Sequence, residues 1–224
     1  MKKISAILIT HNEEEKIEHA LKSLRGVSDE IIVVDSRSTD STIEICRQYT
    51  DRVIEKSWEG YRAQKQFATE QATHNWILSL DADEMLSAEL KKEILEWKNQ
   101  ASKFQSYRIA RKTFFMGRWI SHTTWYPDWQ LRLFTRSSGR WEGGRVHESF
   151  RTSEAPGRLK GQLYHYTYSS FSEYLHQLEH FSTLAAQDYL DSGKKVYWTH
   201  IGFYPPGIFL KNYLVKFGFL DGLP

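Results

Sequence analysis

The feature that most constrains the fold is an alternation of short apolar runs with helix-like segments through the first half of the chain. The runs with strand character are Ile4–Thr10, Ile31–Val34, Arg52–Glu55 and Trp76–Leu80. The segments with helix character are Asn12 to about Leu24, Ser41–Tyr49, Tyr61–Ala72 and Ser87–Trp97. Strands that alternate with helices form βαβ units with right-handed crossovers. The sequence therefore predicts an α/β fold with a mostly parallel sheet flanked by helices.

Two of these helices have predicted starts. Asn12 with Glu15 three positions later matches a capping box, and Ser87 is expected to cap the helix that follows it.

The second half of the chain has a different composition. Residues 1–106 hold 15 Lys and Arg against 19 Asp and Glu, whereas residues 107–224 hold 15 against 9, together with 25 of the 32 aromatic residues. The segments expected here are strands at Tyr107–Arg111 and Leu131–Thr135, an aromatic stretch at Phe114–Trp129, a loop region at Gly139–Phe150 and a helix at Phe171–Tyr189. Because no linker separates the halves, we expect one domain over residues 1–224, with parts 1–106 and 107–224 sharing a core.

Composition also limits the compartment. A single cysteine, Cys46, excludes an internal disulfide framework and a cysteine-built zinc site, so a reducing cytosol is the default. The apolar stretch near the N-terminus is too short for a secretory signal, and no run approaches the roughly 18 apolar residues that span a bilayer. We expect a soluble or peripheral protein.

Two carboxylates, Asp81 and Asp83, directly follow the last strand-like run. Buried carboxylates are costly unless a positive charge lies between them, and oxygen ligands suit Mg²⁺ or Mn²⁺. The alternative is an acidic turn leading into the next helix, where the helix dipole favours acids. A D-x-D pattern is too common to decide between these two interpretations.

Polar residues also follow the first two runs. Asp35 ends the second run, where a strand-end acid commonly accepts hydrogen bonds from ribose or base groups. Thr10 ends the first run and Asn12 follows it, and both are candidate contacts to a ligand. Glu14 is a further candidate contact to a nucleotide, or part of a solvated first helical turn. Since ligands bind beyond the carboxyl ends of parallel strands, we expect these groups to converge on one edge of the sheet.

Taken in order, these segments resemble a known family. ITHNEEE (9–15), VVDSRSTD (33–40) and LSLDADE (78–84) resemble the motifs of family 2 glycosyltransferases. YPDWQLRLF (126–134) and GGRVHESF (143–150) resemble the branch that contains the bacterial lipopolysaccharide inner-core β-glucosyltransferases. The sequence departs from many members at Ser36, where a second acid is frequent, and at Arg37, where glycine is frequent.

The resemblance implies a fold and an activity. The fold is GT-A, with a nucleotide-sugar-binding α/β part followed by an acceptor-binding part. The activity is inverting transfer of a hexose, most simply glucose, from a UDP-sugar to a lipid-linked saccharide in lipopolysaccharide core biosynthesis. It also implies a divalent metal, Mn²⁺ or Mg²⁺, that offsets the charge of the departing diphosphate.

The resemblance further implies a role for individual residues. Asp83 and His147 would hold the metal, and Asp128 would be the general base. The donor would be bound by Thr10, Asn12, Glu14, Asp35, Asp81 and Arg132. The acceptor would be bound by Trp125, Tyr126, Trp129 and Glu148. The residues alone leave other interpretations open: Asp128 in a salt bridge with Arg132, His147 as a structural histidine, and most aromatics as core.

The competing class is a non-catalytic module whose basic, aromatic half binds an anionic glycan or RNA. A nucleic-acid-binding protein normally has a stronger cluster of Lys and Arg along one face than this chain has, so no nucleic-acid partner is expected. A phosphotransferase or nucleotidyltransferase is disfavoured, because the D-x-D follows the fourth strand and the first strand precedes an acidic loop.

The C-terminal stretch from His200 is apolar and punctuated by Lys211 and Lys216. Residues Ile208, Phe209, Tyr213, Val215 and Phe219 are expected along one side of a short helix, with the lysines facing anionic headgroups. The alternative is a helix docked on the core. The ending in Gly-Leu-Pro without a polar tail suggests that membrane-proximal sequence follows. We expect a peripheral protein at the cytoplasmic face of the inner membrane.

Overall fold

The computed structural model describes residues 1–146, 148–168, 170–193 and 195–222. The chain divides into two compact units. The first unit comprises Met1–Ala110 and Trp129–His165, and the second comprises Arg111–Asp128 and Tyr166–Pro224.

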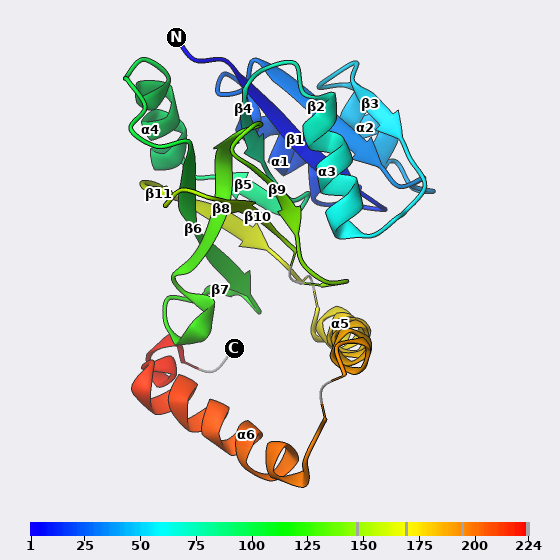
Figure 1. Cartoon of the computed structure of the whole chain (residues 1–224), viewed down its shortest axis with the longest axis vertical. Helices are drawn as coiled ribbons and strands as arrows, with labels where there is room; N and C mark the ends of the chain where they lie inside the picture. The colour runs from blue at the N-terminus through cyan, green and yellow to red at the C-terminus, as the bar shows by residue number, and fades with distance from the viewer. Residues whose placement is uncertain (147, 169, 194, 223–224) are drawn as a thin grey trace. The chain divides into compact units, whose positions relative to one another are not determined.

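The first unit is built on a mixed sheet (Figure 1). Its parallel strands, in spatial order, are β3 (Val53–Glu55), β2 (Glu30–Asp35), β1 (Ile4–Thr10) and β4 (Trp76–Ser79). The order continues with β8 (Asp128–Thr135), β6 (Ser106–Phe115), β11 (Gly157–Tyr166) and β5 (Glu84–Leu86). The β4·β8 and β5·β11 pairs are antiparallel. The predicted α/β class is thereby confirmed, with antiparallel strands added beside the parallel ones.

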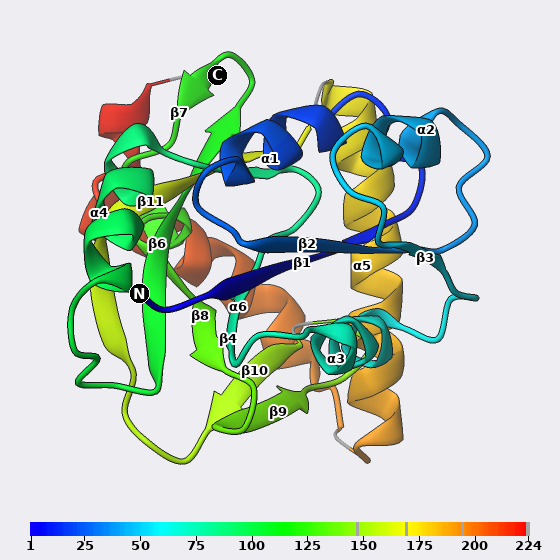
Figure 2. The ribbon, with the colours of Figure 1, turned by 90° about the horizontal axis from the view of Figure 1, so that it is seen from above.

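Helices cover both faces of the parallel strands. Helices α1 (Ile17–Leu24) and α2 (Thr42–Arg47) lie on one side of β1 and β2, and α3 (Tyr61–Gln71) lies on the other (Figure 2). Successive strand residues point to opposite faces, so each strand contributes to two hydrophobic clusters. Ala6 and Leu8 of β1 belong to the cluster under α1, whereas Ile7 belongs to the cluster under α3.

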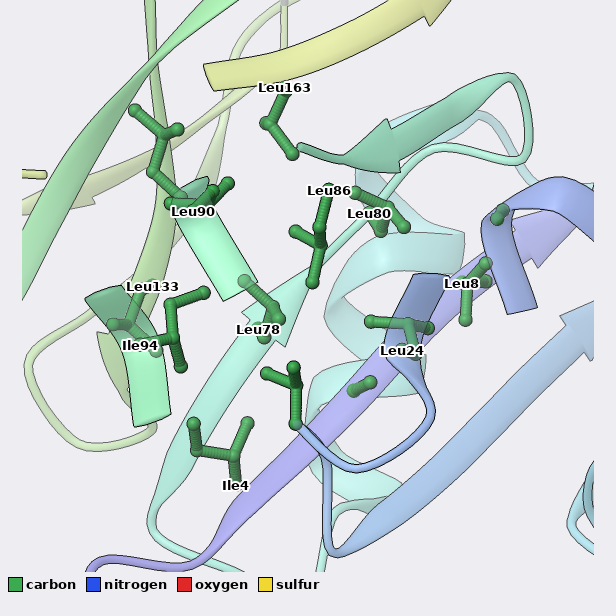
Figure 3. Close-up of a cluster of buried hydrophobic side chains, with 14 of the residues drawn as sticks. Ile4, Leu8, Leu24, Leu78, Leu80, Leu86, Leu90, Ile94, Leu133 and Leu163 are labelled. Atoms are coloured by element: carbon green, nitrogen blue, oxygen red, sulfur yellow. The ribbon is translucent and has the colours of Figure 1, made fainter. Parts of the chain in front are cut away.

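The larger cluster extends beyond the parallel strands. Figure 3 shows side chains from β1, β4, α1, β11 and helix α4 (Ala88–Lys98) converging on it. Tyr107, Ile109, Leu133 and Leu163 belong to the same cluster as Ile4 and Leu78. Residues from both sides of position 106 therefore share this core, because the strands after position 106 join the same sheet.

Most predicted elements have the expected place, but the capping box is wrong. Helix α1 begins at Ile17, and Asn12 has a φ of 54° in the loop before it. Its side-chain oxygen accepts a hydrogen bond from the Thr39 N–H at 2.8 Å, so it ties two loops together instead of capping a helix. The Ser87 cap is confirmed, since Ser87 Oγ accepts from the Leu90 N–H at 3.1 Å.

The predicted loop region Gly139–Phe150 is partly wrong. It contains β9 (Gly139–Glu142) and the start of β10 (Ser149–Thr152), which pair antiparallel. Trp141 of this pair packs against Phe134 and Phe150 in the cluster under α3, and its Nε1 donates to Thr69 Oγ1 at 3.0 Å. The segment pairs as strands because the buried aromatic rings of Trp141 and Phe150 stabilise the antiparallel pair.

The second unit is mainly helical. It contains β7 (Arg118–Trp119), the 3₁₀ turn η1 (Thr123–Trp125), α5 (Phe171–Asp191), α6 (Trp198–Leu210), the π-helical η2 (Lys211–Val215) and the 3₁₀ turn η3 (Gly218–Asp221). Helix α5 confirms the predicted helix. The predicted C-terminal helix is correct in kind but displaced, because regular α-helix ends at Leu210 and not beyond Phe219. No helix in the described ranges is long and apolar enough to cross a membrane.

Candidate active site

The carboxyl ends of β1, β2 and β4 bring the predicted donor residues to one edge of the sheet. Thr10 and Asp35 are register partners at the ends of β1 and β2, and Asp81 follows β4 by two residues. Thr10 Oγ1 donates a hydrogen bond to Asp35 Oδ2 at 2.8 Å. The parallel topology places these groups together, since the strands β1, β2 and β4 all end at the same edge of the sheet.

Asp35 organises the turn after β2. Its carboxylate is fully buried and accepts hydrogen bonds from the Ser38 N–H at 2.7 Å and from Ser38 Oγ at 2.6 Å, besides the one from Thr10. Because a buried carboxylate needs such donors, Asp35 fixes the position of this turn. Arg37 sits within the turn at a φ of 60°.

The loops after β1 and β2 are bound to each other. The Asn12 N–H donates to Ser38 Oγ at 2.9 Å, and Glu14 Oε2 accepts from the Ser41 N–H at 2.9 Å. Asn12 and Glu14, two of the expected donor contacts, therefore also act within the protein. Their contact with a nucleotide stays a prediction.

Asp40 stabilises the turn that leads into α2. Its Oδ1 accepts from the N–H of Thr42 at 3.0 Å and from Thr42 Oγ1 at 2.6 Å. Burial acts to raise the pKa of Asp40, but the hydrogen bonds from Thr42 and from the Glu14 N–H outweigh it, so the pKa is lowered.

Asp81, the first acid of the D-x-D, lies between two cations. Lys65 Nζ of α3 is 2.9 Å from Asp81 Oδ1, and the Arg132 guanidinium of β8 contacts Asp81 Oδ2. Burial acts to raise the pKa of Asp81, but Arg132 and Lys65 outweigh it and hold that pKa well below its usual range. Asp81 therefore stays ionised at neutral pH.

Each of these cations also contacts a second carboxylate. Arg132 Nη2 is 2.6 Å from Glu84 Oε1, and Lys65 Nζ is 2.7 Å from Glu148 Oε1. Lys65 and Arg132 are only 5% and 3% exposed, so their charges are neutralised inside the protein. The donor contact of Arg132 stays a prediction, and its guanidinium contacts Asp81 and Glu84.

Asp83, the second acid, has a different neighbour. Its Oδ2 is 3.0 Å from Nε2 of His165, and both side chains are largely buried. His165 lies on β11, opposite Glu84 of β5 in the antiparallel register. A carboxylate beside an imidazole is a donor set that suits Mn²⁺.

His147, the expected second metal ligand, lies outside the described residues. Within the residues that the structure describes, no group of three or more His, Cys, Asp or Glu side chains is placed to hold a metal ion. Asp83 and His165 therefore supply a pair of ligand-type groups and not a complete cage.

Lys65 and His165 were not predicted from the sequence. No local sequence pattern distinguishes Lys65, because it is one of several polar residues in a helix whose sequence is typical of a solvent-exposed one. His165 lies 82 positions after Asp83, and only the pairing of β11 with β5 brings it to the D-x-D. No spacing pattern could have identified either residue.

The cluster as a whole has a surplus of negative charge. Its carboxylates are Asp81, Asp83, Glu84 and Glu148, and its cations are Lys65 and Arg132. In the ion pairs that the structure describes here, the four acids outnumber the two cations by two. Such a site favours a divalent cation and disfavours an unaccompanied diphosphate.

The expected general base, Asp128, is paired with Arg111 in the second unit. The Nε and Nη2 atoms of Arg111 lie 2.8 and 2.7 Å from Asp128 Oδ2. The pairing partner considered from the sequence was Arg132, which is instead engaged by Asp81 and Glu84. Asp128 and Arg132 are four residues apart on the strand β8. Residues at this spacing lie much farther apart in a strand than in a helix, so the two side chains do not pair.

The expected acceptor residues fall in both units. Trp125 makes an edge contact with Phe115 at 5.4 Å between ring centroids, and the Lys112 ammonium lies 5.7 Å from the centroid of Tyr126, both in the second unit. In the first unit, the Arg158 guanidinium lies 4.8 Å from the centroid of Trp129, and Glu148 binds Lys65. Their contact with an acceptor stays a prediction.

The fold and the D-x-D edge define an α/β protein with a GT-A fold. Residues 5–153 match the family model described as glycosyl transferase family 2, so the chain belongs to this family and is a glycosyltransferase.

Relatives matched over about four fifths of their own length support this membership. The chain is 32% identical to an uncharacterized glycosyltransferase, RT0209, of Rickettsia typhi, over 99% of this chain and 81% of that protein. It is also 32% identical to the lipopolysaccharide core biosynthesis glycosyltransferase LpsC of Rhizobium meliloti, over 94% of this chain and 80% of that protein.

Among solved structures, the chain is similar to S. aureus TarS 1-349. The identity is 27%, the coverage is 52% of this chain and 37% of that chain, and the TM-score is 0.39.

Proposed function

We propose that this chain is an inverting, metal-dependent glycosyltransferase that moves a hexose, most simply glucose, from a UDP-sugar to a lipid-linked saccharide. The observation that carries the metal dependence is the charge of the D-x-D cluster, in which acids outnumber cations by two. Lys65 and Arg132 are already neutralised by carboxylates, so a diphosphate near Asp83 needs another positive charge.

Asp83 and His165 are the described residues that fit such a metal. Their 3.0 Å separation places a carboxylate oxygen and an imidazole nitrogen together, and both atom types are ligands of Mn²⁺. A bound Mn²⁺ or Mg²⁺ would stabilise the negative charge that develops on the departing diphosphate. His147, from the family resemblance, is a further candidate ligand.

The loops after β1 and β2 would bind the nucleoside part of the donor. Asp35 holds the β2–α2 turn through Ser38, and the Asn12 N–H donates to the same Ser38 hydroxyl. These linked loops lie at the carboxyl edge of β1 and β2, where α/β sheets bind nucleotides. A preorganised loop pair reduces the entropy lost when the donor binds.

Asp128 would act as the general base. In an inverting displacement, the acceptor oxygen attacks the anomeric carbon, its proton passes to the base, and the bond from that carbon to the diphosphate breaks with its electron pair on the leaving oxygen. The Arg111 contacts fix the orientation of the Asp128 carboxylate through charge-assisted hydrogen bonds.

The acceptor assignment rests on two similarities. The motifs at 126–134 and 143–150 resemble those of the lipopolysaccharide inner-core β-glucosyltransferases, and the relative LpsC is named for lipopolysaccharide core biosynthesis. We therefore propose a saccharide of the lipopolysaccharide core as the acceptor. A transferase of the same fold with another donor and acceptor is the alternative.

The decisive experiment is a donor screen that measures UDP release. UDP-glucose, UDP-galactose, UDP-N-acetylglucosamine and UDP-N-acetylgalactosamine are compared with Mn²⁺, with Mg²⁺ and with chelator, with and without truncated lipopolysaccharide. We expect release to be fastest with UDP-glucose, to increase with acceptor and to stop with chelator. Faster release from another UDP-sugar would replace UDP-glucose as the proposed donor. UDP release that is undiminished by chelator would contradict the metal role.

A further inference from the structure

Helix α6 is apolar on all sides and has little cover. The exposed fractions of its large apolar side chains run from 52% to 75%, for Trp198, Ile201, Phe203, Tyr204, Ile208, Phe209 and Leu210. A helix that is apolar all round is normally buried, and exposed apolar patches of this kind mark interaction surfaces. The 13 residues of α6 include no Asp, Glu, Lys or Arg.

The geometry of α6 suits a position in a membrane interface and not across it. Thirteen residues make a helix of about 20 Å, against the roughly 30 Å of a hydrocarbon core. Pro205 and Pro206 lie inside the helix and have no N–H to donate to the carbonyls one turn earlier. Such carbonyls are costly in hydrocarbon but can accept hydrogen bonds from water at an interface.

The charge around α6 selects the kind of surface. Residues 192–220 contain four lysines and no acid, and Lys195, Lys211 and Lys216 are exposed. Helix α5, in the same unit, has the opposite composition: it contains Glu173, Glu179, Asp188 and Asp191 and no Lys or Arg. An anionic surface would therefore attract the α6 region and repel α5.

The segment after α6 is tied to the loop that leads to the expected acceptor residues. Asp221 Oδ1 accepts from the Ser121 N–H at 3.1 Å and lies 2.7 Å from His122 Nδ1. The Thr123 N–H donates to the Lys216 carbonyl at 3.1 Å. This loop continues directly into Trp125, so the apolar surface and the acceptor residues of the second unit belong to one connected structure.

We propose that α6, with Lys211 and Lys216, docks in the interface of an anionic phospholipid bilayer. The apolar side chains of α6 enter the boundary between headgroups and acyl chains, and the lysines contact phosphate groups. This inference deepens the proposed function and rests on its lipid-linked acceptor. Docking would present the saccharide of such a lipid to the segment from η1 to the start of β8, which carries Trp125 and Asp128.

The test is flotation of the full chain with vesicles. One set contains phosphatidylethanolamine with about a quarter phosphatidylglycerol, and the other contains only phosphatidylcholine, each at ~0.05 M and ~0.5 M salt to vary the screening length. We expect binding to the anionic vesicles that is at least tenfold stronger than to the neutral ones at low salt and weaker at high salt.

Variants identify the docking element. Ile201→Glu with Phe203→Glu is expected to reduce binding at least tenfold, whereas Leu175→Glu with Leu178→Glu, also exposed leucines but on the acidic α5, leaves it unchanged. Lys211→Gln with Lys216→Gln should remove the preference for anionic vesicles. Lys92→Gln with Lys103→Gln, exposed lysines of the first unit, is the matched control.

Two results would overturn the docking proposal. One is binding that is equal for both vesicle types or unchanged in the Ile201→Glu/Phe203→Glu variant. The other is a wild-type protein that does not bind vesicles and is a dimer in light scattering, while the Ile201→Glu/Phe203→Glu variant is a monomer. That result would assign α6 to contact with a second copy of the chain. UDP release from UDP-glucose without vesicles, measured on the same variants, is expected to persist; its absence in wild type would count against the proposed function and not against docking.

Discussion

Asp81 and Asp83 are two residues apart, yet their surroundings are opposite. Asp81 is held between the Lys65 ammonium and the Arg132 guanidinium, so its charge is already compensated. Asp83 lies beside an imidazole, 3.0 Å from His165 Nε2. Because metal ions compete poorly for a carboxylate that two cations already bind, we expect Asp83 to be the better metal ligand of the two.

Replacement of Asp83 by alanine is the first prediction at this scale. We expect Asp83→Ala to reduce the turnover number at least about 100-fold, because the charge on the leaving diphosphate would lose its compensation. UDP release at saturating UDP-glucose and Mn²⁺ measures the effect. Glu96→Ala, an exposed acid on α4, is the matched control and should keep full activity. A fully active, folded Asp83→Ala enzyme would remove Asp83 from the metal site.

Replacement of Asp128 by asparagine separates chemistry from binding. Asparagine keeps the shape of the side chain but does not accept the acceptor proton, so we expect Asp128→Asn to lose at least about 100-fold in turnover. The dissociation constant of UDP, measured by calorimetry with Mn²⁺, should change less than about threefold. If UDP binding is lost together with turnover, Asp128 has a structural role and the base is another residue.

At the scale of elements, helix α4 is fixed at both ends by side chains. Ser87 caps its start, and Lys98 in its last turn reaches the connection before β2. Lys98 Nζ donates to the Val27 carbonyl at 3.0 Å and lies 2.6 Å from Asp29 Oδ2. Lys98 is only 3% exposed, so this pair connects α4 to the sheet away from solvent.

We expect Lys98→Met to destabilise the protein at neutral pH by about 1–3 kcal/mol, since the Asp29 carboxylate and the Val27 carbonyl would lose their donor. Lys92→Met, exposed on the same helix, should change stability by less than about 0.5 kcal/mol. Urea unfolding measures both variants. Equal stability of the two would show that the Lys98 contacts contribute nothing.

The same pair predicts a dependence on pH. Burial acts to raise the pKa of Asp29, but hydrogen bonds from Lys98 and the Ile4 N–H outweigh it and lower this pKa. The folded-state pKa therefore lies below the unfolded value of about 3.9. The contribution is complete above about pH 5 and is lost as the pH falls through 3.9 toward the folded-state pKa. The stability difference between wild type and Lys98→Met should shrink over that range, and a constant difference would contradict this account.

Gly161 of β11 lets α4 approach the sheet. A Cβ at this position would lie 2.4 Å from Leu90 Cα and 2.6 Å from Leu90 N, so backbone would have to move. We expect Gly161→Ala to cost about 1–3 kcal/mol in urea unfolding. Gly202→Ala, where a Cβ meets nothing within 4 Å on α6, should be neutral or stabilising. A neutral Gly161→Ala variant would mean that the α4–β11 spacing adapts freely.

At the scale of the whole molecule, we expect UDP and Mn²⁺ together to stabilise the folded protein against thermal unfolding more than either does alone. If the D-x-D cluster holds a metal and the diphosphate binds that metal, UDP alone raises the melting temperature little. UDP with Mn²⁺ at about 100 times the dissociation constant should stabilise by about 2.7 kcal/mol. Thermal scans with UDP, Mn²⁺, both, and both with chelator test this. Equal stabilisation by UDP with and without metal would contradict the metal role.

The local patterns predicted the elements of the first half well. Hydrophobic runs located β1, β2, β3 and β4, and the Ser87 cap was correct. The failures share one cause. Asn12 leaves the predicted capping box because Thr39, on another loop, offers its side chain a hydrogen-bond donor, and the strand β11 was missed because its pairing with distant strands, and not its own pattern, defines it.

The sequence by itself determined the fold class, the family and which strand ends carry acids, because apolar periodicity and short motifs are local properties of the chain. The tertiary structure alone decided the state of those acids. Lys65 and Arg132 reach Asp81 from α3 and β8, and His165 reaches Asp83 from β11. Charge compensation depends on distances of a few ångströms between residues far apart in the sequence, and only the folded packing sets those distances.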